Sequence, residues 1–93
     1  MLQEKFVMNC PQGFHLRPAQ VLMEETVGLD SKILFKKENS DTEADAKSIL
    51  SLMSMGIEHG ETVAVTTSGP DEQKAMETVR RLFTTNFGEQ DAQ

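Results

Sequence analysis

The chain has 93 residues, 38% of them hydrophobic, and its formal net charge is −6 at pH 7. A chain of this length holds one hydrophobic core, so we expect a single domain over residues 1–93 with a loose tail over residues 88–93. The acidic balance and the lack of an apolar run of roughly 18 to 20 residues argue against nucleic-acid binding and against membrane association.

The first half of the chain alternates between strand-like and helix-like patterns. Alternating apolar and polar residues predict a strand over residues 5–9. A helix is expected from Leu16, because apolar residues then recur at three-to-four spacing as far as Gly28, which can end a helix in the left-handed conformation. Alternation over residues 31–37 predicts a second strand, whereas the polar stretch 38–45 has room for only a short edge strand.

The second half repeats this alternation and closes with a helix. We expect a short helix over residues 48–55, a strand over residues 61–67, and a turn in which Asp71 caps the final helix. The apolar stripe of that helix is Met76, Val79, Leu82 and Phe83. Polar faces opposite apolar ones predict an α+β fold, in which helices cover one side of an antiparallel sheet.

Acidic residues are absent from two stretches, residues 10–23 and 46–57, whose only formal charges are Arg17 and Lys47. An electropositive surface on an otherwise acidic protein would suit a phosphate group or a negatively charged partner. Short apolar helices can also lack acids for no functional reason, so both interpretations stay open.

The chemistry of the chain concentrates at residues 13–19, Gly-Phe-His-Leu-Arg-Pro-Ala, where Gly13 allows a sharp entry into a helix. The first turn of a helix has backbone N–H groups without intrahelical partners and a partial positive charge, so it binds phosphate readily. His15 offers a nucleophilic ring nitrogen at cellular pH, and Arg17 could clamp phosphoryl oxygens. The same two residues also fit a plain helix cap beside a surface arginine, and the sequence pattern alone leaves both interpretations open.

Other sites have weaker support in the sequence. His59 lies in a predicted loop and is expected to be a solvated residue. The spacing of Cys10, His15 and His59 matches no metal site, and no glycine-rich nucleotide loop is present, so neither a metal nor a nucleotide is expected. The N-terminal residues lack the layout of a signal peptide, and a single cysteine cannot form an internal disulfide bond, which predicts a cytoplasmic protein.

Two segments resemble those of a known family. Residues 13–19 are similar to the active-site signature of the HPr family, the phosphocarriers of the bacterial sugar phosphotransferase system (PTS). Residues 46–56, Ala-Lys-Ser-Ile-Leu-Ser-Leu-Met-Ser-Met-Gly, resemble the second signature of that family, its regulatory serine region. The resemblance covers residues 3–87, and it implies a two-layer open-faced sandwich in which three helices cover one face of four antiparallel strands.

The resemblance also implies a reaction and a set of partners. Enzyme I, charged by phosphoenolpyruvate, would phosphorylate the ring of His15 at the tele nitrogen (Nε2), and Arg17 would help to hold the phosphoryl group. The group would then pass to a sugar-specific Enzyme IIA, so the chain would be a carrier rather than an enzyme, monomeric and without metal or organic cofactor. Ser48 would be a regulatory site for an ATP-dependent serine kinase and a phosphorylase, and the product would act with a catabolite-control transcription factor.

Partner docking is implied for six residues near the two signatures: Leu16, Gln20, Lys47, Ile49, Leu50 and Met53. Helical spacing cannot expose every apolar residue of the second segment, and Leu52 is expected to be the buried one. Leu16 and Gln12 depart from the usual family residues, which leaves open a sugar-system carrier, a nitrogen-branch carrier or a paralogue with its own kinase. Two further alternatives are an HPr-like regulatory protein that carries no phosphate and an unrelated α+β ligand-binding domain.

Overall fold

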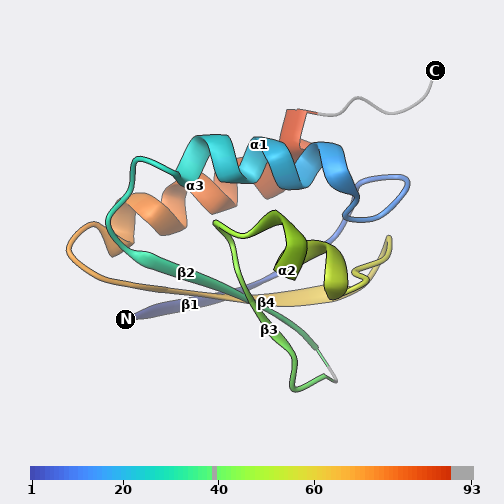
Figure 1. Cartoon of the computed structure of the whole chain (residues 1–93), viewed down its shortest axis with the longest axis horizontal. Helices are drawn as coiled ribbons and strands as arrows, with labels where there is room; N and C mark the ends of the chain where they lie inside the picture. Colours follow the sequence, from blue (N-terminus) through green and yellow to red (C-terminus); the bar gives the residue numbers. More distant parts are fainter. Residues whose placement is uncertain (39, 89–93) are drawn as a thin grey trace.

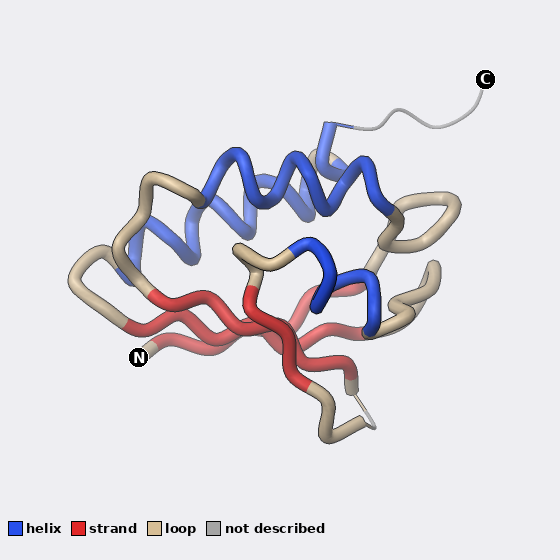
Figure 2. Tube along the Cα trace, viewed as in Figure 1, coloured by secondary structure: helices blue, strands red, loops and turns tan. Residues whose placement is uncertain are grey.

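The computed structural model describes residues 1–38 and 40–88, and it arranges them as a sheet with helices on one side (Figure 1). In chain order the elements are β1 (Leu2–Val7), α1 (Leu16–Thr26), β2 (Lys32–Lys37), β3 (Glu43–Asp45), α2 (Ile49–Ser54), β4 (Thr62–Ser68), α3 (Glu72–Thr84) and the 3-10 turn η1 (Asn86–Gly88). The strands pair antiparallel in the order β1-β4-β2-β3. Figure 2 shows the helices over a single face of the sheet, so the expected open-faced α+β sandwich is confirmed.

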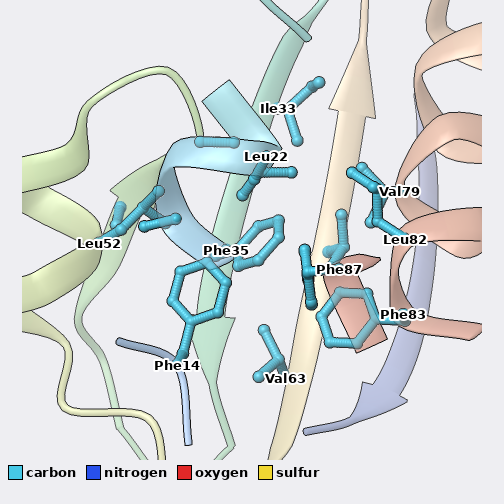
Figure 3. Close-up of a cluster of buried hydrophobic side chains, with 14 of the residues drawn as sticks. Phe14, Leu22, Ile33, Phe35, Leu52, Val63, Val79, Leu82, Phe83 and Phe87 are labelled. Atoms are coloured by element: carbon cyan, nitrogen blue, oxygen red, sulfur yellow. The ribbon is translucent and has the colours of Figure 1, made fainter. Parts of the chain in front are cut away.

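The period-two pattern of the strands decides which side chains face the helices. In β2, Ile33 and Phe35 are fully buried while Lys32 is exposed, and Phe35 stands opposite Val65 in the register with β4. The helices bury matching stripes on the same side, and Figure 3 shows part of the resulting core. The largest fully buried side chains include Phe35, Phe87, Met8, Leu22, Ile33, Leu52 and Met76. The predicted apolar stripe of the last helix is also confirmed, because all of its residues are buried.

The first strand begins earlier than its own alternation predicts. β1 pairs with β4 along its whole length, from Leu2 opposite Thr67 to Val7 opposite Thr62. The partner strand therefore sets the start of β1 rather than the apolar pattern. Met8 lies beyond the last paired residue but is fully buried, and its N–H still donates to Glu61 O at 2.9 Å.

Helix α1 ends without the expected glycine stop. Thr26 Oγ1 donates to Leu22 O at 2.7 Å, and Val27 N donates to Met23 O at 2.9 Å. Val27 keeps a right-handed conformation, and Gly28 does not have a positive φ. The prediction of a left-handed stop at Gly28 is therefore wrong, because the side chain of Thr26 already satisfies a carbonyl of the last turn.

Asp71 joins two loops instead of capping its own helix. It occupies the N-cap position of α3, but its carboxylate makes no cap hydrogen bond there. Oδ2 accepts a hydrogen bond from Asp30 N at 2.9 Å, and Oδ1 accepts from Ser31 N at 2.8 Å and from Ser31 Oγ. The prediction that the Asp71 side chain caps α3 is therefore wrong. Its carboxylate instead bonds to the loop before β2 and so connects that loop to the start of α3.

This network is expected to make stability depend on acid pH. The hydrogen bonds from Ser31 Oγ and Asp30 N hold the pKa of Asp71 below its ordinary value of 3.8. A depressed pKa stabilises the folded state above pH 3.8, and that contribution is lost as the pH falls from there through the lowered pKa. Asp71→Asn should therefore lower the melting temperature by a few degrees at neutral pH, and the gap to wild type should narrow in strong acid.

Thermal unfolding followed by circular dichroism over a series of pH values checks this expectation. Asp41→Asn is a matched control, because Asp41 is exposed and no hydrogen bond ties its carboxylate to another described residue. If the difference in melting temperature between Asp71→Asn and wild type did not change with pH, the role given to the carboxylate would be contradicted.

After α3 the chain makes a left-handed turn that returns a side chain to the core. Asn86, Phe87 and Gly88 have φ values of 54°, 56° and 79°. A left-handed backbone conformation costs an ordinary L-residue about 1–2 kcal/mol, so such a residue keeps it only where the surrounding packing holds it in place. Phe87 is 1% exposed, and its ring packs edge-on against Phe83 with centroids 5.0 Å apart. Gly88 therefore belongs to this turn rather than to a loose tail, and residues 89–93 of the predicted tail lie outside the described residues.

Candidate functional site

The loop between β1 and α1 is held by the segment that follows α2. Gly13 has a φ of 75°, and a Cβ atom there would lie 2.8 Å from Ile57 O, so the position requires glycine. Gly13 N donates to Cys10 O, and Phe14 N donates to Ile57 O, each at 2.9 Å. Phe14 is 5% exposed and anchors the loop in the core. The predicted role of Gly13 at a sharp entry into the helix is confirmed.

His15 stands at the N-cap position of α1, with φ −102° and ψ −170°. The predicted N-cap position is therefore confirmed, although the imidazole itself makes no cap hydrogen bond. Leu16 and Arg17 belong to the first turn, where backbone N–H groups lack intrahelical partners, and Pro18 has no N–H to satisfy. The first helical bond of this turn runs from Ala19 N to His15 O at 3.2 Å. The imidazole therefore lies at the positive end of the helix.

The ring of His15 is half-buried, and its Nε2 atom lies inside the protein. A buried nitrogen cannot meet a phosphoryl group on another protein unless the ring rotates. The expected acceptor atom, Nε2, is thus not the nitrogen that this conformation offers, and Nδ1 is the other nitrogen of the same ring.

A shallow depression of about 550 Å³ opens beside the ring. Its lining residues are His15, Leu16, Arg17, Gln20, Val21 and Glu24. Arg17 is exposed, and within residues 1–38 and 40–88 its guanidinium makes no hydrogen bond or ion pair. The guanidinium is therefore available to bind the oxygens of a group held in the depression. The structure brings His15 and Arg17 together on one surface, with the predicted docking residues Leu16 and Gln20.

Val21 and Glu24 line the depression but were missed by the sequence prediction. Residues three to four apart lie on the same face of a helix, so positions 20, 21 and 24 follow Arg17 along one stripe. This spacing was readable from the sequence once Arg17 had been chosen. The depression extends past the acid-free segment, which ends one residue before Glu24.

The predicted electropositive surface is smaller than expected. The two acid-free stretches do meet, since Phe14 N donates to Ile57 O and α1 contacts α2. Lys47, however, donates from Nζ to Leu29 O, beyond the far end of α1. An 11-residue helix is about 16 Å long, and it separates the Lys47 ammonium from His15 at the opposite end of α1. Among the described residues that line the depression, Arg17 is the only cation, and Glu24 adds an acid there.

Exposed apolar side chains mark the rest of this surface. Leu16 on α1 is 52% exposed, and Leu50 on the adjacent α2 is 82% exposed. Ile49 and Met53 are partly buried, whereas Leu52 is fully buried, as predicted. Large apolar side chains left in water on two touching helices are typical of a surface that meets another protein.

Ser48 lies at the start of α2, as predicted. Its Oγ accepts a hydrogen bond from Ser51 N at 3.4 Å, which makes it the N-cap. The helix runs from Ser48 toward Ile57, the residue that contacts the His15 loop through Phe14. Ser48 is therefore separated from that loop by the length of α2, about 9 Å for its six residues.

The remaining candidates lie apart from this site. His59 is exposed, in line with the predicted solvated loop residue. In the part of the chain that the structure describes, no three His, Cys, Asp or Glu side chains gather to hold a metal ion. None of the helices described there is both long enough and apolar enough to span a membrane.

Comparison with known proteins identifies the family. A family model described as the PTS HPr component phosphorylation site matches residues 2–85. The chain is 35% identical over 77 residues to phosphocarrier protein NPr of Escherichia coli, covering 83% of this chain and 84% of that protein. It is 32% identical over 80 residues to phosphocarrier protein HPr of Mycoplasma genitalium, covering 86% and 90% of the two chains. The crystal structure of HPr from Thermoanaerobacter tengcongensis matches with a TM-score of 0.88 and 30% identity, over 97% of this chain and 99% of that one. The alternative of an unrelated ligand-binding domain is therefore excluded, and the chain belongs to the HPr family of PTS phosphocarrier proteins.

Proposed function

We propose that His15 accepts a phosphoryl group from phospho-Enzyme I and passes it to a sugar-specific Enzyme IIA. The observation that carries this proposal is that His15 and Arg17 line one depression at the start of α1, in a chain of the HPr family. In the first transfer, the lone pair of a ring nitrogen attacks phosphorus, so an N–P bond forms while the donor's bond to phosphorus breaks. In the second transfer, the acceptor's nucleophile attacks and the N–P bond breaks.

Two groups of this chain would stabilise the transferred phosphoryl group. The first-turn N–H groups of Leu16 and Arg17 would donate to its oxygens, and the dipole of α1 favours its negative charge. The guanidinium of Arg17 would bind two oxygens at once, because its donors are arranged as a planar fork. The position of Nε2 inside the protein favours Nδ1 as the acceptor atom. Nitrogen-15 NMR of the phosphorylated protein distinguishes the two ring nitrogens.

The test of the proposal is the intact mass of the protein after incubation with phosphoenolpyruvate and Enzyme I. A gain of one acid-labile phosphoryl group establishes the acceptor role, and subsequent loss of that group to an Enzyme IIA establishes the carrier role. Running the assay with Enzyme I from the sugar system and with its nitrogen-branch counterpart distinguishes the two pathways. If neither enzyme adds a phosphoryl group to the folded protein, the alternative of an HPr-like regulatory protein that carries no phosphate replaces this proposal.

The partners would dock on the surface formed by α1 and α2. Leu16 and Leu50 are its most exposed apolar side chains, and Ile49 and Met53 flank them. A flexible methionine side chain adapts to differently shaped partners, which suits a carrier that must bind both a donor and an acceptor. Lys47 is expected to contribute less than the other predicted docking residues, because its Nζ is already bonded to Leu29 O.

Ser48 is proposed as a regulatory phosphorylation site for a serine kinase, reversed by a phosphorylase. A phosphate there would add negative charge to the N-terminal end of α2, where such charge is tolerated. Direct repulsion of a phosphate at His15 would be weak, because α2 alone puts about 9 Å between Ser48 and the His15 loop and the Debye length is about 8 Å. The effect would instead act on docking, since Ser48 adjoins Ile49 and Leu50. The phosphorylated form could also bind a catabolite-control transcription factor.

Ser48→Asp is expected to slow phosphorylation of His15 by Enzyme I about threefold to tenfold, mainly through a higher KM, because a charge at the rim of a docking surface changes association. Ser48→Asn is the matched control, since Asn is an equally good N-cap without the charge. Steady-state transfer rates at several carrier concentrations measure both. Equal KM values for the Asp and Asn variants would argue against antagonism by charge.

A further inference from the structure

The left-handed turn η1 lies against the start of α1, beside the loop that carries His15 (Figure 1). The ring of Phe87 packs edge-on against Phe14 with centroids 5.3 Å apart. On its other side the same ring contacts Phe83, and Figure 3 shows Phe87 between Phe14 and Phe83. A second link joins the same two segments, because Cys10 Sγ donates to Asn86 O at 3.6 Å. The end of the described chain therefore supports the His15 loop from inside the molecule.

We propose that Phe87 is a positioning residue for phosphoryl transfer at His15 and that it acts through Phe14. This inference rests on the proposed function of His15. Phe14 immediately precedes His15, and its ring packs against two others, Phe35 at 5.9 Å and Phe87 at 5.3 Å. The backbone N–H of Phe14 is held by its hydrogen bond to Ile57 O, and the ring of Phe14 is held in part by its contact with Phe87. Any movement of the Phe14 ring moves the next residue, and with it the imidazole, relative to the first-turn amides.

The backbone conformation supports this role. Asn86 and Phe87 are the non-glycine residues with positive φ among those that the structure describes. Strained conformations of this kind concentrate where function requires a fixed geometry. Here the left-handed turn is what directs Phe87 back into the core, where it is 1% exposed, instead of letting the chain continue α3. The result of the strain is a ring placed against Phe14.

The experiment compares Phe87→Leu with Phe6→Leu in the full chain. Phe6 belongs to the same aromatic cluster, with its ring stacked on Phe83 at 4.7 Å, but it has no ring contact with Phe14. Both variants should lose stability. Only Phe87→Leu should lower the kcat of transfer from phospho-Enzyme I, by about tenfold, with KM changed less than about twofold, because small misplacements of a reacting group act on the chemical step. The NMR signals of the His15 ring should shift in Phe87→Leu and not in Phe6→Leu.

The outcomes separate this inference from the function on which it rests. A wild-type chain that accepts no phosphoryl group removes the proposed function and this inference together. A wild-type chain that accepts the group, with Phe87→Leu equally fast, overturns only the positioning role. Equal losses of kcat in Phe6→Leu and Phe87→Leu also overturn it, because a general loosening of the core would then explain both. If Phe87→Leu does not fold, Phe87→Met replaces it, because the flexible Met side chain fills the same space without the ring.

Discussion

His15→Ala is expected to abolish phosphoryl acceptance from Enzyme I while leaving the fold unchanged. Alanine has no nucleophilic nitrogen, so no N–P bond can form at this position. The fold should be retained because alanine keeps the backbone carbonyl at position 15, which accepts the first helical hydrogen bond of α1 from Ala19 N at 3.2 Å. Intact mass spectrometry after incubation with phosphoenolpyruvate and Enzyme I measures acceptance, and thermal unfolding measures the fold.

His59→Ala is the matched control for that experiment. His59 is the second histidine of the chain, and it lies exposed in the loop before β4. Its replacement should leave acceptance at the wild-type level. A His15→Ala protein that still gained an acid-labile phosphoryl group, or a His59→Ala protein that lost it, would place the acceptor elsewhere than His15.

The local patterns that predicted the fold correctly are those whose cause is local. Ile33 and Phe35 are two residues apart on a strand that packs only one face against the helices, and both are fully buried, whereas Leu34 between them is not. Leu52 was predictable as the buried residue of α2 because helical spacing leaves one side of a short helix facing the sheet. Gly13 was predictable because a strand that turns sharply into a helix needs a residue with positive φ.

The features that the sequence did not predict depend on partners far away in the chain. Asp71 looks like a helix cap until Ser31 is brought to it from 40 residues away. Lys47 looks like part of a basic patch until its Nζ meets Leu29 O. Phe87 follows the last predicted helix, and only the packed core shows that its ring belongs against Phe14. No spacing rule encodes these contacts, because tertiary packing creates them.

The candidate site follows the same division. His15 and Arg17 are two residues apart at a predictable helix start, so their shared depression could be anticipated from the sequence. The direction in which the imidazole points could not be anticipated from the sequence, because the side-chain rotamer depends on the surrounding packing. The position of Nε2 inside the protein is thus information that only the structure supplies.

Arg17→Gln is expected to slow phosphoryl transfer on the order of 100-fold, because it removes a charged donor aimed at the developing negative charge. Arg17→Glu should be slower still, since it places an acid beside the phosphoryl oxygens and joins Glu24 in the same depression. Stopped-flow or quench-flow transfer from phospho-Enzyme I measures the rate. Neither variant should lose much stability, because Arg17 is exposed and bonded to no other residue in the ranges 1–38 and 40–88.

Arg17→Lys distinguishes a clamp from a simple positive charge. Lysine keeps the charge but lacks the planar fork of donors, so a clamp predicts a rate between those of wild type and Arg17→Gln. A lysine variant as fast as wild type would show that only the charge matters. Glutamine and glutamate variants as fast as wild type would remove Arg17 from the transfer step and leave the first-turn N–H groups of α1 as the remaining contacts for the phosphoryl oxygens.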